Sequence, residues 1–291
     1  MLFLMPMQDL EQIKENKTYN HPNFLIKESK NFSLIAEVNK GFLKLLISDQ
    51  QKNILFLQEI KWDSNLENSK AIDLVTLLLK KNDVLYSNFK EVKLLFHSNL
   101  FTLVPIEFHK ETSNLEWLKF NAGDKNVSVT ETTIINSIKA NLIYQAQPEW
   151  KIFFTRNFLK LKTSHFLSSF IDYQIKKTKN ISNPSIWVLG DIDSVFVCVT
   201  RNEILQFANV FEINSPEDFV YSIMLVYESL GIDLNNELIF FGEINFELEA
   251  IDLLKKYLPK FSLGSNPEEI TCELYVKKHQ FQTLFSALLC E

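Results

Sequence analysis

The sequence has few cysteines and histidines, and their spacing suits neither a metal site nor a disulfide framework. Its three cysteines, Cys198, Cys272 and Cys290, are widely separated and form no CxxC pair. An odd and scattered set of this kind predicts neither disulfides nor a thiolate metal centre. None of the five histidines has a partner at H-x-x-x-H spacing. We therefore expect no metal, and we expect Cys198, which lies in an apolar run, to be a small core residue.

An excess of basic residues is also absent. The chain has 36 acidic residues against 30 Lys and Arg, a formal net charge of -6. Proteins that bind a phosphate backbone carry the opposite balance, so we expect nucleic acid not to be a partner. No apolar run reaches the roughly 20 residues of a membrane helix. The apolar first seven residues lack the basic lead of a signal peptide. We expect a soluble cytoplasmic protein without membrane insertion.

Common catalytic motifs are missing as well. The chain contains no GxSxG and no Walker loop. Catalytic groups can also be assembled from distant positions, so this absence concerns recognisable motifs only. Whether the chain is an enzyme therefore stays open at this point, and the absence of enzyme activity is the favoured interpretation.

What the chain does have is length and apolar content. It has 291 residues, of which 46% are hydrophobic, and 25 are Phe. Such a chain exceeds the usual size of one domain and buries a large core. We expect two lobes, residues 31–145 and 146–291, after a polar N-terminal segment at 1–30. This segment is either an arm or a short helix near Gln8–Glu15.

The second half has the clearest local signals. Residues 185–211 read as a meander of three strands. Ser215 then caps a helix that has Pro216 at its first position and acids in its first turn, and Gly231 ends it. Its apolar stripe is Phe219, Ile223, Val226 and Leu230. Later elements are predicted as a strand at 238–241, a helix at 246–258 capped by Asn245, a strand at 274–276 and a helix at 280–289.

The first half repeats this order. Strand-like runs at 32–38, 42–47 and 54–62 precede a helix that starts near Asn68 or Ser69, and a strand follows at 92–96. Residues 101–180 are less regular. Here we expect helical turns within 105–120, a strand at 141–144 and helices at 148–158 and 164–176.

The two halves therefore share one topology of three strands, a helix and a strand. Leu34 corresponds to Trp187 and Leu94 to Ile239, at separations of 60 and 52 residues. These intervals are close enough for a duplicated topology and too different for an array of identical repeats, so we predict two similar α/β lobes. The alternative is two unrelated α+β halves.

Three short segments carry a resemblance to a known family. They are Thr102–Pro105, Phe207–Phe211 with Ser215–Tyr221 after it, and the strand that closes in Gly242. They resemble the domain-of-unknown-function family 3822, a set of uncharacterised bacterial proteins, over about residues 25 to 265. The resemblance gives the family without giving an activity.

The repeated lobe also resembles the duplicated ribonuclease-H-like lobe of the actin, hexokinase and Hsp70 ATPase superfamily, which includes the PilM type of pilus assembly protein. The resemblance implies an α/β fold with two such lobes, each a mixed sheet with a strand meander and flanking helices. It also implies ATP with magnesium in a site between the lobes. In that superfamily an acidic, glycine-containing turn in each lobe holds phosphate, and a strand ending in two glycines meets adenosine.

Three places match these turns in part, and their residues are the candidate nucleotide-binding set: Asn39, Lys40, Gly41, Asp191, Asp193, Ser194, Gly242 and Glu243. The first turn has one glycine and no aspartate. In the second, Asp193 stands where glycine is expected, and two carboxylates beside a triphosphate repel it unless a metal lies between. At the third place Glu243 replaces the second glycine. The alternative is that these residues only form turns and bind no nucleotide.

Residues 150–162 interleave basic and aromatic side chains, as nucleic-acid surfaces can. If this segment is helical, however, Phe154 and Phe158 lie on a core face while Lys151, Arg156 and Lys160 point to water. An RNA-associated factor is therefore an alternative, and a solvated helix face is the competing interpretation.

We conclude from the sequence that the chain is a non-catalytic scaffold or protein-interaction module with a degenerate actin-like ATPase fold. It would have no cofactor and at least one protein partner, whose identity the sequence leaves open together with the oligomeric state. The alternatives are a weak nucleotide-binding protein or unusual ATPase, and the RNA-associated factor.

Overall fold

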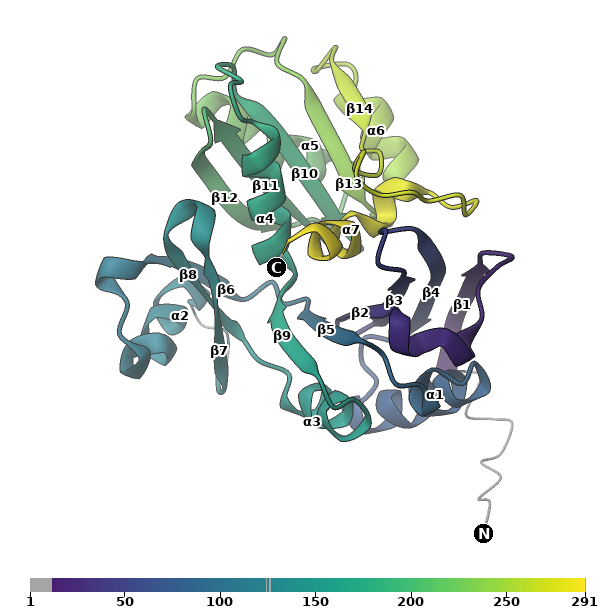
Figure 1. Cartoon of the computed structure of the whole chain (residues 1–291). Helices are drawn as coiled ribbons and strands as arrows, with labels where there is room; N and C mark the ends of the chain where they lie inside the picture. Colours follow the sequence, from purple (N-terminus) through teal and green to yellow (C-terminus); the bar gives the residue numbers. More distant parts are fainter. Residues whose placement is uncertain (1–11, 124, 126, 291) are drawn as a thin grey trace. The chain divides into compact units, whose positions relative to one another are not determined.

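The computed structural model describes residues 12–123, 125 and 127–290, and these form two compact units (Figure 1). The described residues of Met1–Ile134, Ala140–Ser168 and Glu268–Val276 make the first unit, and those of Ile135–Lys139, Ser169–Pro267 and Lys277–Glu291 make the second. Each unit thus collects segments from distant parts of the chain. The lobe boundaries predicted above remain predictions.

The first unit is built on a six-stranded sheet with the order β1-β4-β3-β2-β5-β9. β2, β3 and β4 form an antiparallel meander, β5 runs parallel to β2, and β9 runs parallel to β5. The strands are β1 (Ile13–Asn20), β2 (Ser33–Val38), β3 (Phe42–Ser48), β4 (Ile54–Trp62), β5 (Glu91–Phe96) and β9 (Leu161–His165). The strands predicted in the first half are therefore confirmed.

Two helices of this unit, α1 (Asn68–Lys81) and α3 (Pro148–Asn157), contact each other. Trp62 at the end of β4 stacks on Trp150 of α3 with ring centroids 5.7 Å apart. Both indoles are buried. Aromatic burial of this size makes a large contribution to stability, so the Trp pair fixes α3 to the meander.

A three-stranded sheet, ordered β6-β8-β7, follows β5 in the chain, and α2 contacts β6 and β8. Its small core consists of Val104, Leu118, Val127 and Ile143. The elements are β6 (Phe101–Pro105), α2 (Asn114–Ala122), β7 (Thr130–Ile135) and β8 (Ala140–Gln145). The helical turns predicted within 105–120 and the strand predicted at 141–144 are confirmed.

The second unit contains a five-stranded sheet with the order β12-β11-β10-β13-β14. β10, β11 and β12 are an antiparallel meander, β13 runs parallel to β10, and β14 runs parallel to β13. The strands are β10 (Ser185–Asp191), β11 (Ser194–Arg201), β12 (Ile204–Glu212), β13 (Leu238–Gly242) and β14 (Phe261–Leu263).

Both large sheets therefore arrange their five common strands as third, second, first, fourth and fifth in chain order, and β1 is an extra edge strand of the first. The predicted duplication and fold class are confirmed. Trp187 pairs with Ile239, whereas Leu34 pairs with Val92 and Leu94 with Ala36. The predicted equivalence of Leu34 with Trp187 and of Leu94 with Ile239 therefore matches the strands, with an offset of two residues in one of the pairs.

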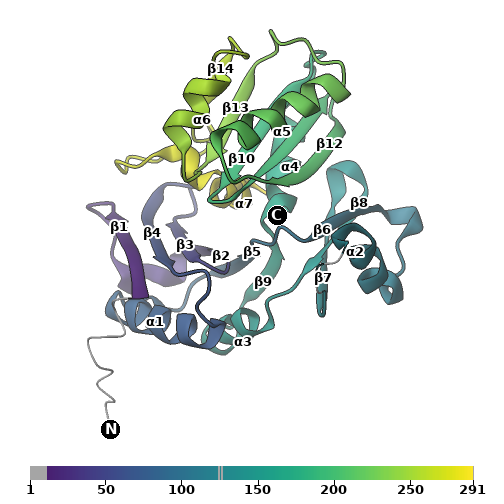
Figure 2. The same ribbon diagram turned by 180° about the vertical axis from the view of Figure 1, so that it is seen from behind.

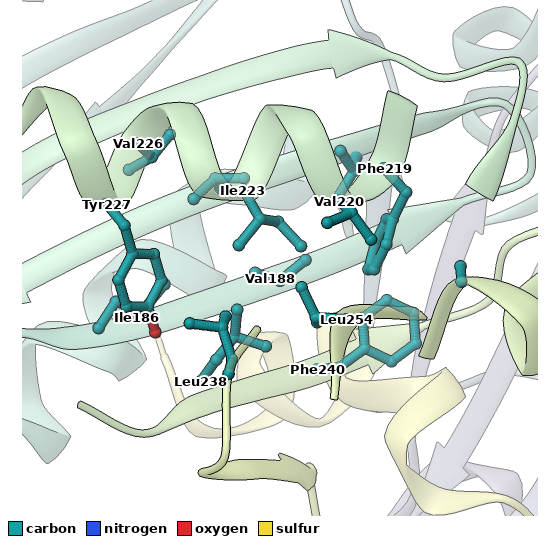
Figure 3. Packing of buried hydrophobic residues seen from close by; sticks show 14 of the residues in the cluster. Ile186, Val188, Phe219, Val220, Ile223, Val226, Tyr227, Leu238, Phe240 and Leu254 are labelled. Atoms are coloured by element: carbon teal, nitrogen blue, oxygen red, sulfur yellow. The ribbon is translucent and has the colours of Figure 1, made fainter. Parts of the chain in front are cut away.

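The core of the second unit lies between its sheet and the pair α5 (Pro216–Ser229) and α6 (Glu247–Leu254), which lie side by side (Figure 2). Figure 3 shows Phe219 and Ile223 of α5 pointing to Val188 and Phe240 of the sheet. Burying each such side chain contributes about 1.5–3 kcal/mol. The predicted stripe of α5 is confirmed except at Leu230, which follows the helix as its C-cap and is exposed.

The predicted cap of α5 is present, since Ser215 Oγ accepts a hydrogen bond from the N–H of Asp218 at 3.1 Å. We expect Ser215→Ala to lower the free energy of unfolding by about 1 kcal/mol, because an N-terminal donor loses its partner. Urea denaturation followed by circular dichroism measures the change. Ser113 is a matched control, because it precedes α2 without a side-chain cap hydrogen bond, and Ser113→Ala should change stability much less.

Several local predictions are wrong. The described part of the expected helix near Gln8–Glu15 contains strand β1 from Ile13, and the rest lies outside the described residues. Residues 274–276 form no strand, and the last strand is β14 instead. Phe246, without a side-chain cap, precedes α6 in place of Asn245.

The remaining helices are α4 (Phe166–Lys177) and α7 (Gln282–Leu289), close to the predicted ranges. Within the described part of the chain, no helix has both the length and the apolar character to cross a membrane.

Candidate functional site

The first candidate turn, Asn39 to Gly41, joins β2 to β3 in the first unit. Its backbone donors are used inside the hairpin: the N–H of Asn39 donates to the carbonyl of Phe42 at 3.0 Å, and the N–H of Lys40 donates to Asn39 Oδ1 at 2.6 Å. Trp62 of β4 donates its backbone N–H to the Gly41 carbonyl at 2.9 Å and its indole N–H to the Lys40 carbonyl at 2.6 Å. The turn is therefore fastened to β4, and the Lys40 side chain is exposed.

A buried acid lies just before this turn. Glu37 Oε1 is 2.7 Å from Nδ1 of His97, and both side chains are buried. The His97 ring stacks on Phe166 with centroids 3.7 Å apart. Since Glu37 is engaged by a histidine inside the same unit, it does not replace the aspartate that the first turn lacks.

The second candidate turn joins β10 to β11, where Asp191 pairs with Ser194. Neighbouring segments hold it in place, because the Ile192 carbonyl accepts from the N–H of Asn245 at 3.3 Å and the Asp193 carbonyl accepts from the N–H of Ile213 at 2.9 Å. Ser194 is buried, and Asp193 is exposed.

The third candidate turn, Gly242 to Glu243, lies beside the second because β13 is the parallel neighbour of β10. Gly242 pairs with Gly190, and the N–H of Glu243 donates to the Gly190 carbonyl at 3.2 Å. Within the second unit, Asp191, Ser194 and Gly242 thus gather at the carboxyl ends of two parallel strands. In α/β sheets this is the end at which ligands usually bind.

Glycines at this end are used for close packing of the protein. Gly242 has φ +82°, and a Cβ there would overlap the backbone of Gly190. A Cβ on Gly190 would lie 2.7 Å from the Ile244 side chain, and one on Gly264 would overlap the Phe241 ring. The space beside each of these glycines is therefore filled by the protein itself. Gly264 was not among the predicted residues.

Carboxylates also surround this turn. Asp191, Asp193 and Glu243 lie at the strand ends, and Glu212 is the strand partner of Ser194. Several carboxylates repel the phosphates of a nucleotide unless a cation lies between them. No group of three or more His, Cys, Asp or Glu side chains that could hold a metal ion occurs among the residues that the structure describes.

The basic aromatic segment forms α3 and the start of β9. Its aromatic side chains Trp150, Phe153, Phe154 and Phe158 are buried, so they are not available for stacking on bases. Lys151 forms an ion pair with Glu131 at 2.8 Å. The helical interpretation is confirmed for residues 150–157, and the RNA hypothesis loses the aromatic platform on which it was based.

Burial favours the uncharged forms of two further side chains, Cys198 and His165. Burial raises the pKa of the Cys198 thiol, which keeps it protonated and unreactive at neutral pH. Burial also lowers the pKa of His165 to about 3. His165 is therefore neutral at physiological pH, and its Nε2 lies 2.9 Å from the Ser98 carbonyl.

The repeated sheet order, with a meander and a helix before the fourth strand, defines the actin-like ATPase fold, which is ribonuclease-H-like. A crystal structure from Bacteroides thetaiotaomicron, of a protein with actin-like ATPase fold and unknown function, matches with a TM-score of 0.77 and 17% identity, covering 92% of this chain and 99% of that one. The PilM–PilN complex of type IV pilus biogenesis matches with a TM-score of 0.52 and 13% identity, covering 88% and 98%.

The chain belongs to the family described as protein of unknown function (DUF3822), whose model matches residues 21–261. The resemblance stated from the sequence is thereby confirmed. A comparison with curated proteins found no match.

Proposed function

We propose that this member of the family is a non-catalytic scaffold or protein-interaction module that keeps an actin-like ATPase fold without using nucleotide. The observation that carries this proposal is the packing around Gly242. In the superfamily that this fold resembles, two glycines at this strand end leave the space beside them to adenosine. Here the backbone of Gly190 occupies that space next to Gly242, and Phe241 occupies the space next to Gly264.

The first turn supports the same proposal. Phosphate-binding turns present backbone N–H groups to the ligand. The N–H groups of Asn39 and Lys40 donate inside the hairpin instead, and the turn carries no carboxylate to position a metal-bound water. The PilM–PilN complex is a precedent for a protein of this fold in a protein assembly, and it supports a protein partner for this chain.

The test is an assay of magnesium-dependent ATP hydrolysis by the full chain. We expect no turnover above a buffer control, and the same result for Asp191→Ala, because the turns lack the groups that position phosphate and water. Turnover that depends on magnesium and disappears in Asp191→Ala would overturn the proposal.

A second candidate is a weak nucleotide-binding protein that uses Asp191, Asp193 and the Gly242 turn. It is favoured by one observation, that these residues meet at the carboxyl ends of the parallel strands β10 and β13. With magnesium between the carboxylates and the phosphates, such a site would bind ATP without hydrolysing it. Calorimetry separates this candidate from the first, as argued below.

A further inference from the structure

Helices α5 and α6 have an unusual charge composition. They carry six acidic residues and no Lys, Arg or His within their bounds: Glu217, Asp218, Glu228, Glu247, Glu249 and Asp252. The two helices contact each other and cover one face of the same sheet (Figure 2). They therefore form neighbouring parts of the outer layer of the second unit, acidic within the helix bounds, and Lys255 and Lys256 follow α6.

The end of α5 departs from the pattern of α1 to α4. Each of α1 to α4 has at least one Lys or Arg in its last turn, where the helix dipole favours a cation. The last turn of α5 carries Glu228 and no base, as that of α7 also carries no base, whereas α6 has Lys255 as its C-cap. An acid at the end of α5 is unfavourable for that helix itself.

The outward side of α5 is also apolar in part. Glu217, Tyr221, Leu225 and Glu228 follow one another at intervals of three or four residues and so share one side of the helix. This side is opposite the buried Phe219 and Ile223. Tyr221 is 67% exposed and Leu225 is 38% exposed. An apolar pair is thus flanked by a carboxylate at each end.

The outward side of α6 continues this pattern. Leu248 is 80% exposed, and the exposed Glu249 and Asp252 lie beside it, away from the buried Ala250 and Leu254. Among the described residues, none of the four exposed carboxylates of the two helices has an ion-pair partner. We call the surface formed by Tyr221, Leu225, Leu248 and these four carboxylates the acidic helical surface.

We propose that the acidic helical surface is the docking site of a basic amphipathic helix of a partner protein. Charge complementarity selects the partner, because the carboxylates attract Lys and Arg and repel both nucleic acid and anionic lipid. Glu217 and Glu228 are eleven residues apart, about 16 Å along the helix axis, so matching cations lie about three turns apart in the partner. Between them, leucine or aromatic side chains cover Tyr221, Leu225 and Leu248. This proposal rests on the interaction role proposed above and names the class of partner.

The experiment uses the full chain and a fluorescent 18-residue probe helix. One face of the probe carries Leu and Trp between two Lys clusters that lie about three turns apart. Fluorescence anisotropy gives its affinity. Two matched probes are compared, one with the same composition in scrambled order and one with Glu in place of each Lys. We expect binding of the amphipathic basic probe only, and weaker binding at higher salt because exposed charges are screened.

Variants of the surface locate the binding site. We expect Glu217→Gln with Glu228→Gln to weaken binding about fivefold and Leu248→Ser to weaken it about tenfold. Glu116→Gln and Phe120→Ser on α2 are matched controls, since Glu116 and Phe120 are exposed residues of the other unit. They should leave the affinity unchanged.

Glu228→Lys separates binding from folding. It complements the helix dipole, so we expect the melting temperature to rise by about 1 °C while the affinity for the basic probe falls. If Glu228 were kept only because it stabilises the fold, Glu228→Lys would lower the melting temperature instead.

Equal binding of the scrambled probe, no binding of any probe at millimolar concentration, or equal affinity in the surface variants would overturn the docking site. Retention of the chain on anionic vesicles would overturn the choice of a protein partner. These outcomes are independent of the ATP hydrolysis assay, so failure of the docking site is distinguishable from failure of the proposed non-catalytic role.

Discussion

Gly242→Ala is expected to lower the free energy of unfolding by more than about 4 kcal/mol, at the upper end of single-residue effects. Gly242 has φ +82°, a conformation that L side chains rarely adopt, and a Cβ there would overlap the backbone of Gly190. Because backbone atoms of β10 cannot turn aside as a side chain would, β10 and β13 would have to separate. Urea denaturation followed by circular dichroism measures the loss.

Gly231→Ala is the matched control for this variant. Gly231 also has positive φ, at +60°, but nothing lies within 4 Å of the position that a Cβ would take. We expect Gly231→Ala to lower the free energy of unfolding by about 1 kcal/mol, because only the positive φ disfavours Ala there. Similar losses in the two variants would mean that β10 and β13 do not approach as closely as described, and the packing argument for an occupied strand end would fail.

Trp62→Ala is expected to lower the free energy of unfolding by about 3–5 kcal/mol. The buried indole stacks on Trp150, and its N–H fastens the turn at Lys40. Removing it takes away a large buried surface and leaves the Lys40 carbonyl without its indole donor. Urea denaturation gives the change in stability, and hydrogen exchange at residues 39–41 reports on the order of the turn.

Trp62→Phe separates these two contributions. Phe keeps most of the packing against Trp150 but removes the indole N–H that donates to the Lys40 carbonyl. We expect a loss of about 1 kcal/mol from the hydrogen bond, with some addition for the smaller ring. If Trp62→Phe is as costly as Trp62→Ala, packing is not the main contribution of this residue.

The sequence predicts best those elements whose signals are local. The run 195–199 is continuous and apolar, and it lies in the buried strand β11. Ser215, Pro216 and the acids after them predict the start of α5 to the residue, because capping involves neighbours within four positions. The duplication also follows from such runs, since the order of strong strands and helices repeats.

Three of the four edge strands of the two large sheets were missed, whereas the edge strand β12 was predicted. β1 and β9 lie at the two edges of the first sheet, and β14 lies at an edge of the second and has three residues. β1 contains Lys14, Glu15 and Lys17, and pairing with β4 supports it through contacts such as that of Glu15 with Lys61 at 3.2 Å. These three strands are stabilised by pairing with strands that are distant in the sequence. A local apolar pattern does not indicate such pairing.

The sequence predicted which residues make up the candidate site, but it did not predict how they pack. Asp191 and Gly242 were singled out from the sequence, and the parallel pairing of β10 with β13 brings their turns together. Gly264 packs on Phe241, although the two residues are 23 positions apart in the sequence and lie at the ends of two neighbouring strands. No local pattern encodes this approach, so whether the glycines serve a ligand or the protein is visible only in the fold.

The most direct measurement is a calorimetric titration of the full chain with ATP, ADP and GTP in the presence of magnesium. The proposed non-catalytic role predicts no saturable heat for any of the three nucleotides, in the natural chain or in Asp191→Ala. Saturable binding of ATP that requires magnesium and is lost in Asp191→Ala would contradict it, and would establish the turn between β10 and β11 as a nucleotide site.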